Sequence, residues 1–225
     1  MPLSAPAARQ LAHTRVVTCK GYERDDGLWD IEGHIIDTKP FSFPNKDRGG
    51  KIEADEPLHS MWIRLTIDLD MKIHAAEQTT EFSPYNYCQQ IEHFCQNLVG
   101  HRIAPGWTVK VKELMGASKG CTHLTELLGP VATTAYQTLV KAKFKKAEAD
   151  SSTAKDSKTP RKAPGYLGSC HALQLDSPVI KEHFPQFYKE NRNLVQLVMK
   201  HMNLATIKQY RLEERRRMAT RARSN

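Results

Sequence analysis

The sequence predicts an α+β fold: an antiparallel sheet of hairpins, two main helices packed on one face of it, and a C-terminal helix. Three observations support this expectation. Residues 28–37 and 61–68 alternate between apolar and polar side chains, which is typical of strands. Residues 83–99 and 121–140 carry apolar side chains at helical spacings of three and four. Hairpin signals follow one another without strict β-α alternation, so we expect five or six antiparallel strands.

The composition is that of a globular protein with one core. The chain has 225 residues, of which 40% are hydrophobic and 26% charged, which suits one domain with appendages. No window approaches 18 consecutive apolar residues, so we expect no membrane span. The N-terminus has no charged start followed by an apolar block, and the five cysteines are scattered. These features predict a cytoplasmic protein with reduced thiols.

The formal net charge of +8 is concentrated in the C-terminal part. Residues 1–140 contain 14 Lys and Arg against 17 Asp and Glu, a net of −3. Residues 141–225 contain 19 against 8, a net of +11. A basic tail can engage nucleic acid or an acidic partner, but it lacks a nucleic-acid motif and aromatic residues among its arginines. Nucleic-acid binding is therefore disfavoured. The charge distribution favours no particular oligomeric state.

The expected domain organisation follows these composition changes. We expect residues 1–8 to be disordered, and residues 9–142 together with 165–190 to form one α+β domain. A flexible basic linker is expected at 143–164, rich in Lys, Ala and Ser and dispensable for folding. A basic helix is expected at 191–225.

The first hairpin is predicted around an Asp-Gly turn. Val16 to Cys19 forms a strand-like run, Arg24 to Gly27 gives the turn, and residues 28–37 return. Alternation places Trp29, Ile31 and Ile35 on one face of the return strand. Asp30, Glu32 and His34 then share the other face, which is either a solvated outer surface or a polar row that binds metal and transfers protons.

Residues 39–57 are rich in Pro, Gly and charge, and predict a surface loop. A second hairpin follows, with strands at 61–68 and from Ile73 to Ala76. His59 stands just before it, either as a surface residue or as a functional imidazole.

Two further elements are expected in the middle of the chain. Ser83-Pro84 predicts the start of a helix over 83–99, in which Cys88 and Cys95 lie on the apolar stripe and act as core residues. Residues 107–114 alternate and predict a strand with Val109 and Val111 facing inward.

The stretch Gly120-Cys121-Thr122-His123-Leu124 combines a glycine, a thiol and an imidazole at the start of a predicted helix. A helix N-terminus favours a thiolate, which is a nucleophile and a metal ligand. Cys121 and His123 share a site only if Cys121 precedes the helix proper, because residues two apart on a helix diverge. The alternative is a buried Cys121 with His123 exposed. Pro130 should kink or restart this helix.

The C-terminal part predicts a strand that starts at Ser169, turns at Asp176-Ser177 and returns through Val179-Ile180. Cys170 and His171 are adjacent, so in a strand only one of them can join a given site.

Four motifs resemble, in order, those of a mostly bacterial family catalogued only as a domain of unknown function. They are Arg24-Asp25-Asp26-Gly27-Leu28-Trp29-Asp30-Ile31-Glu32-Gly33; Glu56-Pro57 with His59 and Met61-Trp62; Gly120-Cys121-Thr122-His123-Leu124 with Glu126-Leu127-Leu128; and Cys170-His171-Ala172. The likeness spans roughly residues 9–184 and implies one coherent domain without a mechanism. The Lys/Ser-rich insert before Cys170 and the arginine-rich extension after about residue 190 depart from the family pattern.

The residues predict three kinds of function. The first is a small-molecule enzyme whose catalytic residues are Cys121, His123, Glu32, Asp30 and His59. In such an enzyme, Cys121, His123 and His171 could ligate a divalent transition metal such as zinc or iron. The second is a non-catalytic metal or iron–sulfur carrier, although the cysteine spacings match no ferredoxin pattern. The third is a binding module that uses the basic tail. We expect Cys121 and His123 to lie near Glu32 and near at least one of His59 and His171, with these side chains lining a single concavity.

Overall fold

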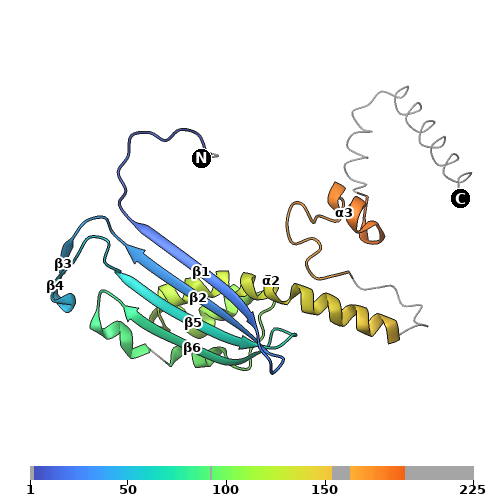
Figure 1. The fold of residues 1–225 in the computed structure, drawn as a ribbon, viewed down its shortest axis with the longest axis horizontal. Helices are drawn as coiled ribbons and strands as arrows, with labels where there is room; N and C mark the ends of the chain where they lie inside the picture. The colour runs from blue at the N-terminus through green and yellow to red at the C-terminus, as the bar shows by residue number, and fades with distance from the viewer. Residues whose placement is uncertain (1–2, 92, 154–162, 191–225) are drawn as a thin grey trace, which may run out of the picture. The chain divides into compact units, whose positions relative to one another are not determined.

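The computed structural model describes residues 3–91, 93–153 and 163–190 (Figure 1). It divides into two compact units, residues 1–155 and 156–225, and each is described by itself. Assignment of residues 165–190 to the same domain as 9–142 therefore stays a prediction. The predicted helix at 191–225 lies outside the described residues.

The first unit is an α+β fold built on an antiparallel sheet, as predicted, and this sheet has four strands. The strands are β1 (Thr14–Glu23), β2 (Trp29–Thr38), β5 (His59–Ile67) and β6 (Ile73–Phe82), in the order β1-β2-β5-β6 (Figure 1). Each neighbouring pair is antiparallel, and β6 is longer than the predicted return strand. The main sheet has fewer strands than predicted, because two of the predicted strand segments fold as helix or turn.

The hydrophobic core lies against one face of the four-stranded sheet, which we call the inner face. In β2 the side chains alternate strictly between buried and half-buried, and Trp29, Ile31 and Ile35 point inward as predicted. The helix α2 (Thr122–Thr153) packs against this face over β1, β2 and β5. Gly33 permits the close approach, because a Cβ there would lie 2.5 Å from Val131 Cγ2 on α2. The burial of these apolar side chains between sheet and helix is the main stabilising contribution to the fold.

The predicted surface loop at 39–57 contains a small two-stranded sheet. It consists of β3 (Phe43–Asn45), the 3-10 helix η1 (Lys46–Arg48) and β4 (Gly50–Ile52). The Asn45 side chain donates to the carbonyl of Pro84, and Arg48 donates to the carbonyls of Pro57 and Ser83. These hydrogen bonds hold the segment 39–57 against the rest of the first unit.

Two predictions in the middle of the chain are wrong in type. The predicted α-helix at 83–99 is a pair of 3-10 helices, η2 (Asn86–Ile91) and η3 (Phe94–Leu98). The Ser83 hydroxyl bonds the carbonyl of Tyr85 instead of capping an α-helix. Cys95 and Leu98 are nevertheless buried in the core, and Cys88 is half-buried.

The predicted strand at 107–114 is the helix α1 (Trp107–Met115). Its buried residues are Trp107, Val111 and Met115, four apart, whereas Val109 is 62% exposed. A left-handed Gly106, with φ of 88°, starts the helix. The apolar residues of this segment fit both the strand period of two and the helical period of 3.6. In the helix, the Trp107 indole donates a hydrogen bond to the Leu128 carbonyl of α2 at 3.1 Å. A 3-10 turn, η4 (Ala117–Lys119), then leads to Gly120.

Helix α2 is continuous from Thr122 to Thr153 and includes Pro130, so the helix does not restart at the proline. It enters the segment predicted as a linker, whose first part is therefore helical. Residues 154–162 of that segment lie outside the described residues, and its mobility and dispensability stay predictions.

The described part of the second unit contains turns and two short helices, α3 (Pro178–His183) and η5 (Pro185–Phe187). No strand is present among residues 163–190, so the strand pair predicted at 169–180 is wrong. Ser177 caps α3 by accepting a hydrogen bond from the Ile180 N–H, and Pro178 occupies the first turn. This Ser-Pro signal favours a helix start, and it outweighs the short apolar alternation.

Within the described chain, no helix is both long and apolar enough to cross a membrane.

Candidate metal and thiol site

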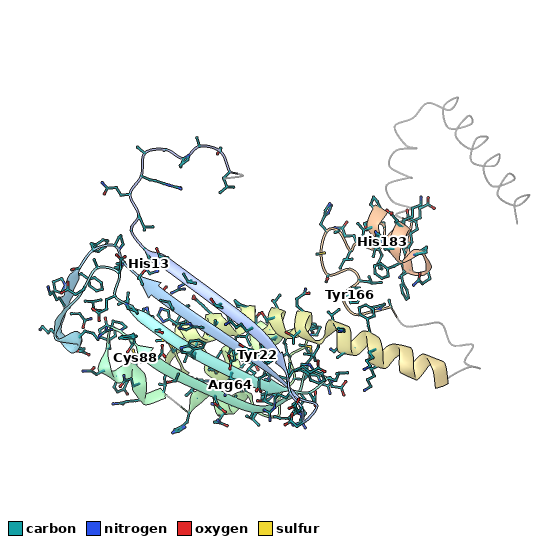
Figure 2. The ribbon with its side chains drawn as sticks, in the orientation of Figure 1. His13, Tyr22, Arg64, Cys88, Tyr166 and His183 are labelled. Carbon is teal, nitrogen blue, oxygen red and sulfur yellow. The ribbon has the colours of Figure 1, made fainter. Side chains whose placement is uncertain are left out.

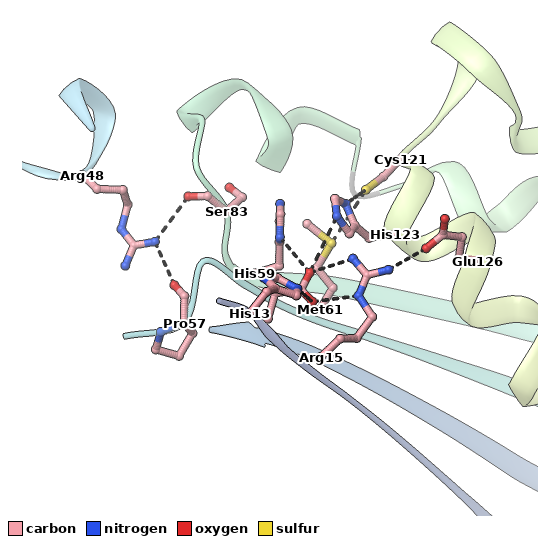
Figure 3. Close-up of polar contacts among 11 residues, drawn as sticks. His13, Arg15, Arg48, Pro57, His59, Met61, Ser83, Cys121, His123 and Glu126 are labelled. Carbon is pink, nitrogen blue, oxygen red and sulfur yellow. Dashed lines mark hydrogen bonds and ion pairs between the residues drawn. The ribbon is translucent and has the colours of Figure 1, made fainter. Parts of the chain in front are cut away.

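Four segments meet at one end of the inner face of the sheet: the start of β1, the end of β2, the start of β5 and the start of α2. Strand register places Arg15, Asp37 and His59 side by side on β1, β2 and β5. Helix α2 adds His123 from its first turn, and Cys121 directly precedes it (Figure 3). The polar cluster therefore lies beneath the helix that covers the core.

Asp37 is the centre of this cluster and is only 1% exposed. Arg15 donates to both of its oxygens, from Nε at 2.7 Å and from Nη2 at 2.9 Å. His59 Nδ1 lies 3.0 Å from Oδ2, and His13 Nε2 lies 3.1 Å from Oδ1. Burial alone would raise the pKa of Asp37, but the hydrogen bonds and charge of Arg15 outweigh it and lower this pKa to about 2. Asp37 is therefore an anion at neutral pH.

Arg15 also joins the cluster to α2. Its Nη1 donates to Glu126 Oε2 at 2.8 Å, one turn beyond His123. The guanidinium thus bridges a buried carboxylate on the sheet and an exposed one on the helix (Figure 3).

The two imidazoles of His59 and His123 lie against each other, with ring centroids 3.8 Å apart and planes tilted by 33°. His123 Nε2 is 3.8 Å from Asp37 Oδ2. Burial lowers the pKa of both histidines, and for His59 the nearby His123 lowers it further, although Asp37 opposes the shift. Both rings are therefore biased toward the neutral form, which is the form that ligates metals or accepts a proton.

Cys121 lies where the prediction required it, immediately before the helix. Its carbonyl accepts a bond from the Thr125 N–H at 2.9 Å, and its Sγ lies 3.7 Å from His123 Nδ1. Gly120, just before Cys121, packs closely on the end of α1, because a Cβ at that position would lie 2.5 Å from the Met115 carbonyl oxygen. A second sulfur, Met61 Sδ on β5, lies 3.7 Å from Cys121 Sγ (Figure 3).

Asp37, His59 and His123 form a group that could hold a metal ion. One ligand atom from each residue lies within 4.8 Å of the others. Two histidines and a carboxylate are a known ligand set for non-haem iron, and three protein ligands leave positions open for a substrate. The side chains of His59 and His123 are 12% and 23% exposed, so the group is accessible from solvent.

Asp30 and Glu32, two of the predicted catalytic residues, lie on the opposite face of the sheet. Glu32 pairs with Arg64 at 2.8 Å, and Asp30 accepts from the Thr66 hydroxyl at 2.7 Å. Figure 2 shows the position of Arg64 on the sheet. Strand alternation causes this separation, because even-numbered residues of β2 point away from the inner face that carries Asp37. Neither carboxylate is near the cluster of Cys121, His59 and His123.

His171, the third predicted metal ligand, and Cys170 belong to the second unit, in a stretch of turns. Both are exposed. Their participation in the site stays a prediction.

The sequence reasoning missed Asp37, Arg15 and Met61. Asp37 had a readable signal: it continues the odd-numbered positions of β2, where Trp29, Ile31 and Ile35 are apolar. A carboxylate in line with a buried face needs compensating partners, so it marks a polar cluster. Arg15 and Met61 gave no such signal, because their roles depend on which strands pair.

Fold and site together define an α+β protein with a buried carboxylate, two imidazoles and a thiol gathered at one end of its sheet. The chain belongs to the family described as "Protein of unknown function (DUF2889)", whose model matches residues 13–137. This match confirms the resemblance to a family without an established function, and the Cys170-His171-Ala172 motif lies beyond the matched residues. No curated protein and no solved structure matches the chain.

Proposed function

We propose that the protein is an enzyme that acts on a small molecule at a transition-metal centre built on His59 and His123. The observation that carries this proposal is the clustering of these imidazoles with Asp37, with ligand atoms within 4.8 Å of one another. Neutral imidazoles are the commonest metal ligands in proteins, and a partly exposed site admits a substrate.

The arrangement around the imidazoles supports a catalytic role for the metal. A metal that keeps an open position can polarise a substrate oxygen or lower the pKa of a bound water. Asp37 holds His59 through Nδ1 at 3.0 Å, as a carboxylate does for a metal-ligating histidine. The hydrogen bond from Asp37 orients the His59 ring, and strand β5 and helix α2 hold the two imidazoles in place.

The test begins with metal analysis of the protein purified without a histidine tag, which should give about one transition-metal ion per chain. The variants His59→Ala and His123→Ala should lose it. The control His74→Ala removes an exposed histidine that bonds Asp68, outside the cluster, and should keep the metal. Incubation of metal-loaded protein with a mixture of cellular metabolites, followed by mass spectrometry, should reveal turnover that His123→Ala lacks. Metal binding without turnover would favour the carrier function.

A second candidate is a metal-free thiol enzyme. Cys121 precedes a helix N-terminus, and its Sγ lies 3.7 Å from His123 Nδ1, while His123 Nε2 faces Asp37. In this function His123 takes the thiol proton, Asp37 stabilises the imidazolium, and the thiolate attacks the substrate. Activity that survives complete removal of metal but not Cys121→Ser would favour this candidate.

A further inference from the structure

The face of the main sheet opposite the inner face, which we call the outer face, carries a groove over strands β5 and β6. Its volume is about 350 Å³, within the range of about 300 to 1,000 Å³ that small-molecule sites occupy. The side chains that give this outer-face groove its chemistry are an aromatic ring, a hydroxyl and four charged groups. They are Glu32, Trp62, Arg64, Glu77, Thr79 and Glu81.

Trp62 forms one wall of the outer-face groove. Strand register places it between His34 on β2 and Thr79 on β6. The His34 ring stacks on one face of the indole, with centroids 3.6 Å apart and planes only 8° from parallel. The opposite face of the indole is therefore turned toward β6 and the groove. Such a face attracts both apolar groups and cations.

Arg64 lies at one end of the groove and is already paired. Its guanidinium contacts Glu32 at 2.8 Å and Glu77 at 3.3 Å, from the strands on either side. One cation between two carboxylates leaves this end with a net charge of −1. An anionic ligand would have to compete with both carboxylates for the same guanidinium.

Glu81 lies at the other end, where a register shift in the pairing of β5 with β6 falls next to Ser60. The buried Ser60 hydroxyl donates to Glu81 Oε2 at 2.6 Å, and His34 Nε2 lies 2.9 Å from the same hydroxyl. Hydrogen bonds from Ser60 and from the Trp62 indole lower the pKa of Glu81, so it is an anion at neutral pH. Among the described residues, no lysine or arginine pairs with this carboxylate.

The charge of the groove selects the class of ligand. Three carboxylates (−3) and one guanidinium (+1) give it a net charge of −2. The carboxylate without a cationic partner, Glu81, lies next to the free face of Trp62. A cation can therefore contact a carboxylate and an aromatic face at the same time, and each of these contacts is favourable.

We propose that the outer-face groove binds a small primary amine, whose ammonium group pairs with Glu81 and whose apolar body lies against Trp62. An ammonium has three donors and no acceptor, which matches carboxylates that only accept. The stacked ring of His34 holds Trp62 in place before the ligand arrives, so little ordering is needed on binding. The groove lies on the opposite face of the sheet from His59 and His123, and its role does not depend on the proposed metal centre.

The test compares three probes of similar size and different charge: 2-phenylethylamine, 2-phenylethanol and phenylacetate. Chemical-shift titration of the full chain gives the affinity of each. We expect the amine to bind at least tenfold more tightly than the alcohol, and phenylacetate to bind most weakly. Equal affinities of amine and alcohol, or no binding of the amine, would overturn the proposal.

Variants locate the binding in the groove. Glu81→Gln keeps an acceptor for the Ser60 hydroxyl but removes the charge, and should weaken amine binding at least tenfold. Trp62→Leu should weaken it severalfold. The control Glu113→Gln removes an exposed carboxylate of α1 that pairs with Lys110, outside the groove, and should bind like the wild type. Thermal unfolding verifies that each variant folds. Unchanged affinity in a folded Glu81→Gln would show that the amine binds elsewhere and would refute the assignment.

Discussion

Arg15 and Asp37 face each other across the first strand pair, and the guanidinium donates to both carboxylate oxygens at 2.7 and 2.9 Å. The pair lies on the inner face of the sheet, where β2 is otherwise apolar. Because Asp37 also contacts His59 and His13, this pair sets the electrostatics of the whole cluster.

The pH dependence of stability should reveal Asp37. Its folded-state pKa of about 2 is below the ordinary aspartate pKa of 3.8, so its ionised form stabilises the native state above pH 4. This contribution, about 2 kcal/mol, disappears as the pH falls from 4 to 2. Asp37→Asn should therefore be less stable than the wild type by at least this amount at pH 7, in the absence of metal. Denaturant unfolding at several pH values measures the difference, which should narrow toward pH 2; a constant difference would contradict the assignment.

Substitution of Gly33 should disturb the packing of helix α2 on the sheet and lower the stability of the protein. In Gly33→Ala the new Cβ would lie 2.5 Å from Val131 Cγ2, so the packing must shift, and we expect a loss of about 1 to 3 kcal/mol. Gly129→Ala is the control on α2, since its Cβ meets no atom within 4 Å. Helix propensity predicts that this control gains about 0.5 to 1 kcal/mol. Urea unfolding of both variants gives the comparison, and equal stabilities would refute the close packing.

Two valines test the helical assignment of residues 107–115. Val111 is 3% exposed and Val109 is 62% exposed. Val111→Ala should cost about 1 to 3 kcal/mol of stability through lost packing. Val109→Ala should be neutral or stabilising by a few tenths of a kcal/mol, because alanine favours a helix. In a strand these residues would share a face, so similar losses at both positions would support a strand instead.

Metal removal should lower the melting temperature of the loaded protein. A ligand that binds only the native state stabilises it by about 2.7 kcal/mol at one hundred times its dissociation constant. Chelation should therefore lower Tm by several degrees in the wild type and in His74→Ala. In His59→Ala the chelator should have no effect. Differential scanning calorimetry with and without chelator makes the measurement, and a chelator-sensitive His59→Ala would exclude His59 as a ligand.

Local sequence determined the hairpins and the position of the thiol. Strict alternation fixed the two faces of β2, and the Asp-Gly turn fixed the first hairpin, because both depend on neighbouring residues along one strand. Cys121 was expected at the start of a helix over 121–140, and it directly precedes α2, which begins at Thr122. The segment at 107–115 was misread because short apolar runs satisfy helical and strand periods equally well.

The tertiary structure alone decided which polar residues meet. Asp30 and Glu32 have the right chemistry, yet they lie on the outer face, while the inner-facing Asp37 receives Arg15 and His59 from the paired strands. Met61 gained its place beside Cys121 in the same way, since β5 and the start of α2 are 60 residues apart in the chain. Side-chain alternation is a local property that the sequence carries. Strand register and helix docking result from burial of the whole inner face, and they decide which side chains can share a metal ion.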